Sequence, residues 1–100
     1  MHQDAVERFR VCIPLFQALS DSARQDIILL LAEQQPLTVN EIAASSNLSR
    51  PAISHHLKIL RDNGLLAMEQ QGTQRYYSLS LENAVSVIKN LVTTVEETCL

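Results

Sequence analysis

The chain has 100 residues, of which 46% are apolar and 19% charged, and its formal net charge at pH 7 is −3. This length suits a single domain, and the longest uncharged apolar run, residues 27–32, is far shorter than the ~20 residues of a membrane span. Two cysteines are too few for a disulfide-stapled secreted scaffold and the N-terminus is charged, so we expect a cytoplasmic protein.

The first two predicted elements are helices. Apolar residues recur at helical spacing over about residues 4–19. Pro14 lies inside this helix, where it removes a backbone donor and clashes with the carbonyl four residues earlier, so we expect a kink or a restart near residues 10–13. Asp21 is placed to cap a second helix that is apolar on most sides, as a central core helix should be.

A helix-turn-helix is predicted over about residues 38–63. Thr38 opens its first helix, and Glu41 lies three residues on, where it can complete a capping box. Asn47 follows at a point where a tight turn would need a positive φ, which Asn tolerates better than most residues. Leu48 is expected to pack inward.

The second helix of this pair, over residues 50–62, contains two adjacent histidines. Ser49 is its predicted N-cap, and Pro51 lies in the first turn, where a missing N–H group costs little. At ~100° per residue, His56 borders the apolar side and is expected to pack or hydrogen-bond there, whereas His55 faces outward. Because two metal ligands on a helix normally lie three or four residues apart, this pair is not expected to bind one ion.

Beyond Gly64, the predicted C-cap of that helix, the apolar pattern becomes alternating. It predicts a two-stranded hairpin, or wing, over about residues 65–79 with Gly72 at its tip. A last helix with a long apolar stripe follows over about residues 81–98. Residues 1–100 are therefore predicted to form one winged helix-turn-helix domain, mainly α with a small β-hairpin, in the order α-α-α-α-β-β-α.

Charge is uneven along the chain: residues 49–75 carry four cations and two anions, and the remainder carries four cations and nine anions. A capped helix with small polar residues near its start and cations beside them can lie in the major groove of DNA, with base edges at its N-terminus and phosphates at its flanks. The predicted contacts are Ser54 and His55 to bases, Arg50 to bases or phosphate, Lys58, Arg61 and Arg75 to phosphates, and Ser49, Pro51, Ala52, Gln71 and Thr73 around them.

Three segments, ALSDSARQDIILLL, NEIAASSNLSRPAISHHLKILRDNGLL and RYYSL, resemble the ArsR/SmtB family of winged-helix transcriptional repressors in order and spacing. The resemblance implies a homodimer that uses its first and last helices as the interface and binds a pseudo-palindromic DNA operator. Independently, those helices carry more apolar surface than the ends of so short a chain readily bury. The predicted interface residues are Val6, Phe9, Cys12, Ile13, Phe16, Val85, Ile88, Leu91, Val92 and Val95.

The chain departs from that family in its metal-binding motifs. The segment LTVNEIA holds no thiol where relatives carry a cysteine motif, and the last helix holds no histidine. His2, Cys12 and Cys99 form no recognisable ligand set, so we expect no metal and no cofactor, and the effector stays open. The sequence shows neither a nucleophile paired with a base nor a Gly-rich phosphate loop, so we do not expect an enzyme. Two alternatives remain: a repressor that senses thiol chemistry or a metal through its cysteines, and a winged-helix module that docks a protein.

Overall fold

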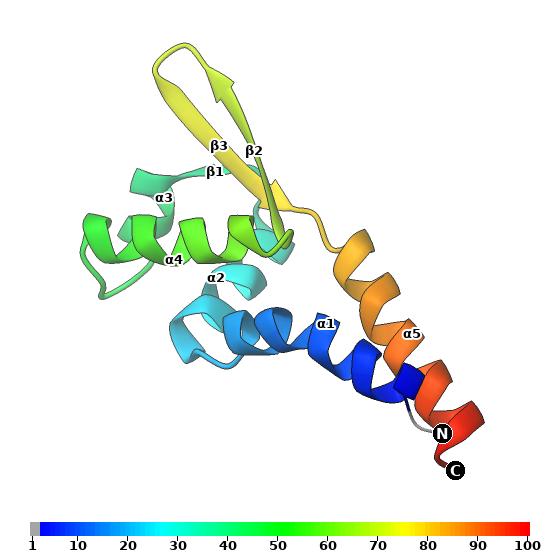
Figure 1. Ribbon diagram of the computed structural model, residues 1–100. Helices are drawn as coiled ribbons and strands as arrows, with labels where there is room; N and C mark the ends of the chain where they lie inside the picture. The colour runs from blue at the N-terminus through cyan, green and yellow to red at the C-terminus, as the bar shows by residue number, and fades with distance from the viewer. Residues whose placement is uncertain (1–2) are drawn as a thin grey trace.

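The structure is a computed structural model that describes residues 3–100. Within that range the chain forms a winged helix-turn-helix, as predicted, with a hairpin that projects from a bundle of helices (Figure 1). The elements in chain order are α1 (Gln3–Leu19), α2 (Ser22–Glu33), β1 (Leu37–Thr38), α3 (Val39–Ala44), α4 (Arg50–Asp62), β2 (Leu66–Gln71), β3 (Gln74–Leu79) and α5 (Glu82–Thr98).

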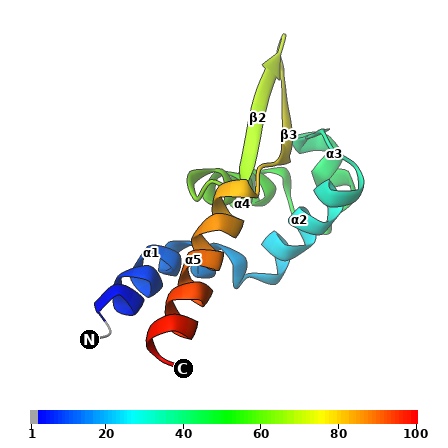
Figure 2. The same ribbon diagram turned by 90° about the vertical axis from the view of Figure 1, so that its right-hand side faces the viewer.

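The molecule is elongated, with principal extents of 51 × 25 × 20 Å. One end holds α2, α3, α4 and the hairpin. At the other end α1 and α5 pack side by side and carry the two chain ends (Figures 1 and 2). None of the helices over residues 3–100 is both long enough and apolar enough to cross a membrane.

The core lies where the helix-turn-helix meets the sheet. It buries the apolar sides of α2, α3 and α4 against the start of the hairpin and the first turn of α5. This arrangement holds α4 by one side and leaves the opposite side at the surface. The most deeply buried large side chains here are Leu31, Ile42, Ile53, Leu57, Leu60 and Leu65.

The sheet has three antiparallel strands in the order β1-β3-β2, so the predicted two-stranded hairpin was incomplete. β1 pairs with β3 in the register Leu37 to Tyr77 and Thr38 to Tyr76. A strand of two residues is too short to show alternation, and the predicted helix cap at Thr38 masked it. The added strand anchors the base of the wing beside α3.

Local hydrogen bonds confirm the predicted caps of the helix-turn-helix. The N–H of Glu41 donates to Thr38 Oγ1 at 3.2 Å, and the N–H of Thr38 donates to Glu41 Oε1 at 3.0 Å, which completes the capping box. The N–H of Ala52 donates to Ser49 Oγ at 3.3 Å, with Pro51 in the first turn. Both helices therefore begin where the sequence indicated.

Two predictions about the turn between α3 and α4 were wrong. Over residues 3–100 only Gly64 and Gly72 have a positive φ, so Asn47 does not adopt it. The turn closes instead through Ser46, whose Oγ accepts a hydrogen bond from the N–H of Leu48 at 3.0 Å. Leu48 is 38% exposed rather than packed inward, because the turn holds it at the rim of a hollow beside α2.

The predicted restart of the first helix is absent, because α1 is one helix through Pro14. Packing of one side of α1 along α5 accounts for this, since tertiary contacts can hold a helix across one lost backbone hydrogen bond.

The end of α4 is closed by Gly64, whose φ is +72°. The N–H of Leu65 donates to Leu60 O and the N–H of Gly64 donates to Arg61 O, each at 3.0 Å. This pair of bonds is a Schellman motif, which needs a left-handed residue just past the helix. It turns the chain directly into β2, and Gly72 makes the corresponding turn at the tip of the wing.

Candidate nucleic-acid interface

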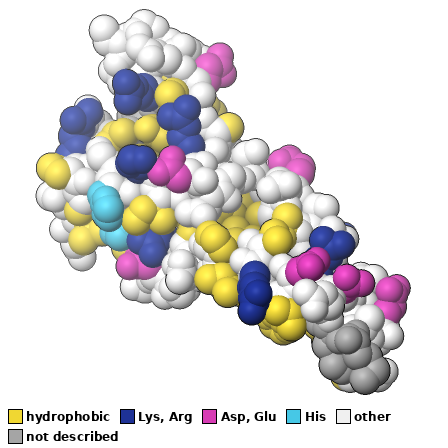
Figure 3. Space-filling view, viewed as in Figure 1, with side chains coloured by type: hydrophobic (Ala, Val, Ile, Leu, Met, Phe, Trp, Pro, Cys, Tyr) yellow, Lys and Arg dark blue, Asp and Glu magenta, His cyan; other side chains and the backbone are white. Residues whose placement is uncertain are grey.

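A groove of about 680 Å³ lies between α4, the start of α3 and the β2–β3 wing. Its lining includes Arg50, Lys58, Arg61 and Arg75, which are four of the eight Lys and Arg residues in the chain. Figure 3 shows Lys and Arg side chains gathered where α4 meets the hairpin, while Asp and Glu are frequent toward the α1–α5 end. We call this surface the α4–wing groove. It is a local positive site on a chain of negative net charge.

The cations of the groove differ in how they are held. Arg50 Nε donates to Asn40 Oδ1 at 2.8 Å, which fixes its direction at the start of α4. Lys58 Nζ lies 2.7 Å from Asp62 Oδ2, but both side chains are well exposed. Water screens such a pair, so a phosphate can replace Asp62 at little loss. Arg61 makes no salt bridge within residues 3–100 and is available to an anion.

The structure separates the two histidines as predicted. His55 is exposed, whereas His56 is half-buried with its Nδ1 at 3.1 Å from Arg24 Nη1. Because a guanidinium only donates, His56 Nδ1 accepts this bond and its ring proton lies on Nε2. The rings lie 6.0 Å apart with their planes tilted by 53°. His55 is thus the histidine that faces solvent, and His56 is part of the scaffold.

Strand register decides which wing residues face the groove. Gln70 pairs with Arg75, and Met68 pairs with Tyr77, so these four share the side that faces the helices. Gln71 lies on the opposite side of β2 and does not line the groove. Register does not decide the tip itself, because Gln74 pairs with Gln71 and still lines the groove. The sequence alone could not fix this register, because the apolar alternation ends before the tip.

The groove brings together only part of the predicted DNA-contacting set. Outside the groove lining lie Ser49, the N-cap of α4, and Pro51, Ala52 and His55 in the first half of that helix. All but the half-buried Ala52 are exposed. Predicted residues that line the groove are Arg50, Ser54, Lys58, Arg61, Thr73 and Arg75. Among the lining residues that were not predicted, Asn40, Gln70 and Gln74 carry side-chain amides, and for Asn40 the available signal was its place in the first turn of a capped helix.

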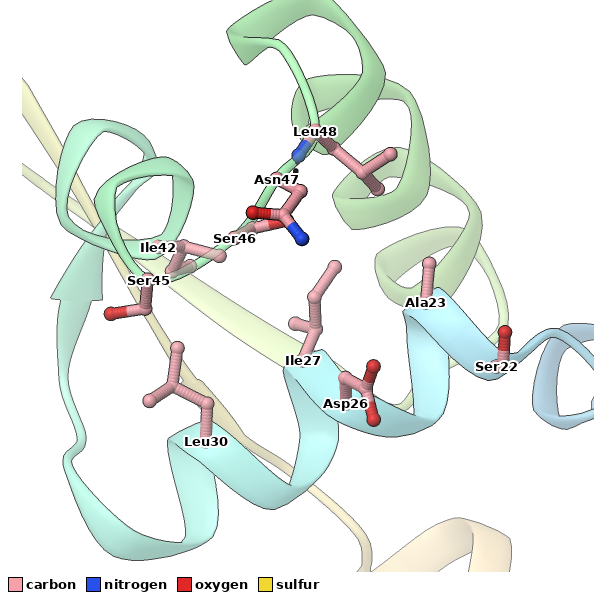
Figure 4. A pocket seen from close by; sticks show the side chains of 10 residues that line it. All are labelled: Ser22, Ala23, Asp26, Ile27, Leu30, Ile42, Ser45, Ser46, Asn47 and Leu48. Carbon is pink, nitrogen blue, oxygen red and sulfur yellow. Dashed lines mark hydrogen bonds between the residues drawn. The ribbon is translucent and has the colours of Figure 1, made fainter.

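A second hollow, of about 380 Å³, lies between α2 and the turn that precedes α4. Figure 4 shows Ala23 and Ile27 of α2 directed toward this turn, with Asn47 and Leu48 on the other side. Asp26 is the one charged residue of the lining, so the hollow repels phosphate rather than attracting it. Of the two hollows, only the α4–wing groove has the charge that nucleic acid requires.

The α1–α5 end carries an apolar surface of its own. Its exposed members, each 40–51% accessible, are Val6, Phe9, Ile13, Phe16, Val85 and Val92, and we call them the apolar face. Of the other predicted interface residues, Ile88 and Val95 are half-buried, whereas Cys12 and Leu91 are already buried between α1 and α5. An apolar surface this extended on so small a chain is typical of a protein contact.

The two cysteines lie in different environments. Cys12 is fully buried, with its Sγ 3.8 Å from the carbonyl of Val87 on α5, so it packs as a small core residue rather than at an exposed interface. Cys99 is exposed at the end of α5. Over residues 3–100 no three His, Cys, Asp or Glu side chains lie close enough to hold a metal ion, and His2 falls outside the described residues.

Comparison with known proteins connects these surfaces to a family. Residues 21–67 match the family described as bacterial regulatory protein, arsR family. The chain is 42% identical over 72 residues to the arsenical resistance operon repressor of Escherichia coli, a match that covers 72% of this chain and 62% of that protein. It is also 35% identical over 81 residues to the transcriptional repressor SdpR of Bacillus subtilis, which covers 78% of this chain and 89% of SdpR.

A solved structure supports the fold. The winged helix-turn-helix DNA-binding domain of a possible ArsR-family regulator from Mycobacterium bovis, described as homodimeric, superposes with a TM-score of 0.71. The match covers 96% of this chain and 88% of the Mycobacterium bovis domain at 22% identity, so it shows the fold alone. The chain thus matches nearly the whole of SdpR and of this domain, but less than two thirds of the Escherichia coli repressor.

Proposed function

This chain belongs to the arsR family of bacterial regulatory proteins, and from that premise we propose that it is a homodimeric repressor that binds a pseudo-palindromic operator. It is a DNA-binding transcriptional regulator, a class distinct from enzymes, and we propose that it acts in the cytoplasm. The observation that carries the proposal is the α4–wing groove, which holds half of the Lys and Arg residues of a chain whose net charge is −3.

In this proposal α4 enters the major groove, because an α-helix fits there and its first turns meet the base edges. Ser54 and His55 contact bases, since both are exposed on the outward side of α4. Arg50 is held by Asn40 beside them. The cations Lys58, Arg61 and Arg75 bind phosphates on either side, and the Gln-rich wing adds hydrogen bonds to the backbone.

The apolar face supplies the second half of the proposal, because two copies that bury it together present two α4 helices. A two-fold dimer reads half-sites related by the same symmetry, about one helical turn of DNA apart. The homodimeric state of the Mycobacterium bovis domain supports this assignment.

The test is direct binding to DNA. Fragments selected by the protein from a random duplex library should share a palindrome, and affinity for it should fall with salt at a log–log slope of about −5, as six phosphate contacts per dimer predict. A duplex of equal length with one half-site scrambled is the control. A protein-docking module would show neither the palindrome nor the slope, and either absence would refute the proposal.

A thiol- or metal-sensing repressor is the second candidate, and the same assay separates it from a repressor without these effectors. We expect operator affinity to be equal for reduced and oxidised protein and unaffected by added Zn²⁺, because Cys12 is sealed in the core. A several-fold change with either treatment would favour the sensing alternative.

A further inference from the structure

Arg24, in the first turn of α2, contacts the end of α1. Its Nε donates to Ala18 O at 2.7 Å and its Nη2 donates to Gln17 O at 3.3 Å. These carbonyls belong to the last turn of α1, where a helix leaves acceptors without internal partners. The Arg24 side chain is only 13% exposed, so its guanidinium is held in one geometry at the junction of α1 and α2.

The same guanidinium also reaches the recognition helix, because Arg24 Nη1 donates to His56 Nδ1 at 3.1 Å. His56 lies in the middle of α4, next to His55, which we assign to base contact. One side chain therefore hydrogen-bonds both to the helix of the apolar face and to the helix that reads DNA.

Neighbouring groups satisfy the end of α1 without making this link. Gln25 Nε2 donates to Leu19 O at 2.8 Å, and Ser20 Oγ donates to Gln17 O at 2.8 Å. Asp21 Oδ2 lies 3.9 Å from Arg24 Nη1 and balances its charge. Of the side chains that bond to the end of α1, Arg24 is the one whose described hydrogen bonds extend to α4.

We infer that Arg24 is a positioning residue that fixes the recognition helix α4 relative to the dimerisation helix α1, and so sets the half-site spacing that the dimer accepts. The inference rests on the proposed function. Apolar packing between α2 and α4 is non-directional, whereas a planar guanidinium with three bonds fixes both distance and angle. In a two-fold dimer any shift of α4 occurs twice, so the spacing between the two reading helices amplifies it.

The first experiment measures spacing preference. Affinities of wild type, Arg24→Ala and His56→Ala are compared on the selected operator and on versions with one base pair added or removed between half-sites. Both variants should lose about ten-fold on the best spacing and discriminate less among spacings, with non-specific affinity unchanged. His56→Asn keeps an acceptor close to the position of Nδ1 and should behave as wild type.

Two controls separate positioning from loss of stability. Ile27→Val removes one methyl group from the core side of α2 and none of these hydrogen bonds, so it should lower the melting temperature without changing spacing preference. The double variant Arg24→Ala/His56→Ala should lose no more affinity than either single variant, because both remove the same link. Sedimentation should show dimers throughout.

A second measurement needs no DNA. Nitroxides attached at Ser54→Cys in a Cys99→Ser background report the distance between the two α4 helices of the dimer by pulsed electron resonance. The distribution should be narrow for wild-type Arg24 and for His56→Asn, and broad for Arg24→Ala. An unchanged distribution in Arg24→Ala would overturn the inference, as would unchanged spacing preference. If wild type instead binds no palindrome, the proposed function fails while this distance still decides the inference.

Discussion

The two ends of the molecule use similar amphipathic helices for opposite kinds of surface. In α4 the apolar side chains Ile53, Leu57 and Leu60 are at most 1% exposed, and the outward side is polar and cationic. In α1 the apolar residues cover more than one side, so Phe9 and Ile13 stay about half exposed even though α5 packs against the helix. The difference teaches that what a helix leaves uncovered, rather than its composition, indicates its partner.

Charge sharpens the contrast. The α4–wing groove collects four cations with Asp62 as its one acid, whereas most of the acidic residues lie elsewhere on the chain. A negatively charged body weakens non-specific attraction to DNA elsewhere and favours binding at this positive surface. The proposed apolar contact between copies at the other end would keep that surface free for DNA.

The largest expected effect comes from breaking the apolar face. Phe9→Asp places a carboxylate where the second copy would bury it, and an uncompensated buried charge costs about 3 kcal/mol or more, roughly a 100-fold weaker dimer. Sedimentation equilibrium should show monomers, and operator affinity should fall by at least as much. Val11→Asp is the matched control, because Val11 is more exposed but lies about 200° around the helix from Phe9. Equal effects of the two variants would contradict the assigned face.

The next effect concerns base reading by α4. His55→Ala should lower affinity for the preferred half-site by about ten-fold and leave non-specific binding and salt dependence unchanged, because a base-edge contact carries sequence information but no phosphate charge. Repeating the selection from a random library measures it directly. If the recovered sequence preference is as sharp as that of wild type, His55 does not read bases.

A smaller and different effect is expected at Lys58. Lys58→Ala should weaken specific and non-specific binding alike and reduce the salt slope by about one unit per protomer, or about two for a bound dimer. Lys89→Ala, an exposed cation on α5, is the control and should change neither. An unchanged slope in Lys58→Ala would mean that Asp62 retains the lysine when DNA is bound.

The sequence predicted most of the fold because local chemistry sets most of it. Caps at Asp21, Thr38 and Ser49 each depend on a side chain and an N–H group within three residues, and glycine is the residue that supplies the left-handed turn after α4. The amphipathic stripes placed His55 outside and His56 inside. These features need no knowledge of distant parts of the chain.

What the sequence did not predict depends on partners far along the chain. The two residues of β1 become a strand only because β3 lies beside them, and Gln70 faces the groove because of hairpin register. Arg24 donates a hydrogen bond to His56, which lies 32 residues away, and no local sequence pattern predicts this pair. Packing against α5 likewise keeps α1 continuous through Pro14. Long-range contacts determine these four features, and the periodicity of apolar residues does not predict long-range contacts.

The turn that joins α4 to the wing offers a test of stability alone. Gly64→Ala should lower the free energy of unfolding by about 1 kcal/mol, because its φ of +72° strains any residue with a Cβ. Space is not the cause, since the nearest atom to an added Cβ is Asn83 Nδ2 at 4.0 Å. Urea unfolding measures it. Gly64→Asn should recover part of the loss, and DNA sequence preference should not change in either variant.

The smallest effect is expected at Asp21, the N-cap of α2. The N–H of Arg24 donates to its Oδ1 at 3.1 Å and lowers the pKa of this carboxyl below its ordinary value of 3.8. Because folding lowers the pKa, the ionised carboxylate stabilises the fold. This contribution is fully present above the ordinary value of 3.8 and is lost as pH falls through the folded-state pKa. Asp21→Asn keeps a capping oxygen but has no charge to lose. The melting temperature of wild type should therefore exceed that of the variant at pH 7, and the difference should shrink as pH falls below 3.8. The effect should be small, because the group is exposed to water. A difference that stays constant as pH falls would assign the cap to hydrogen bonding alone, with no contribution from the charge of Asp21.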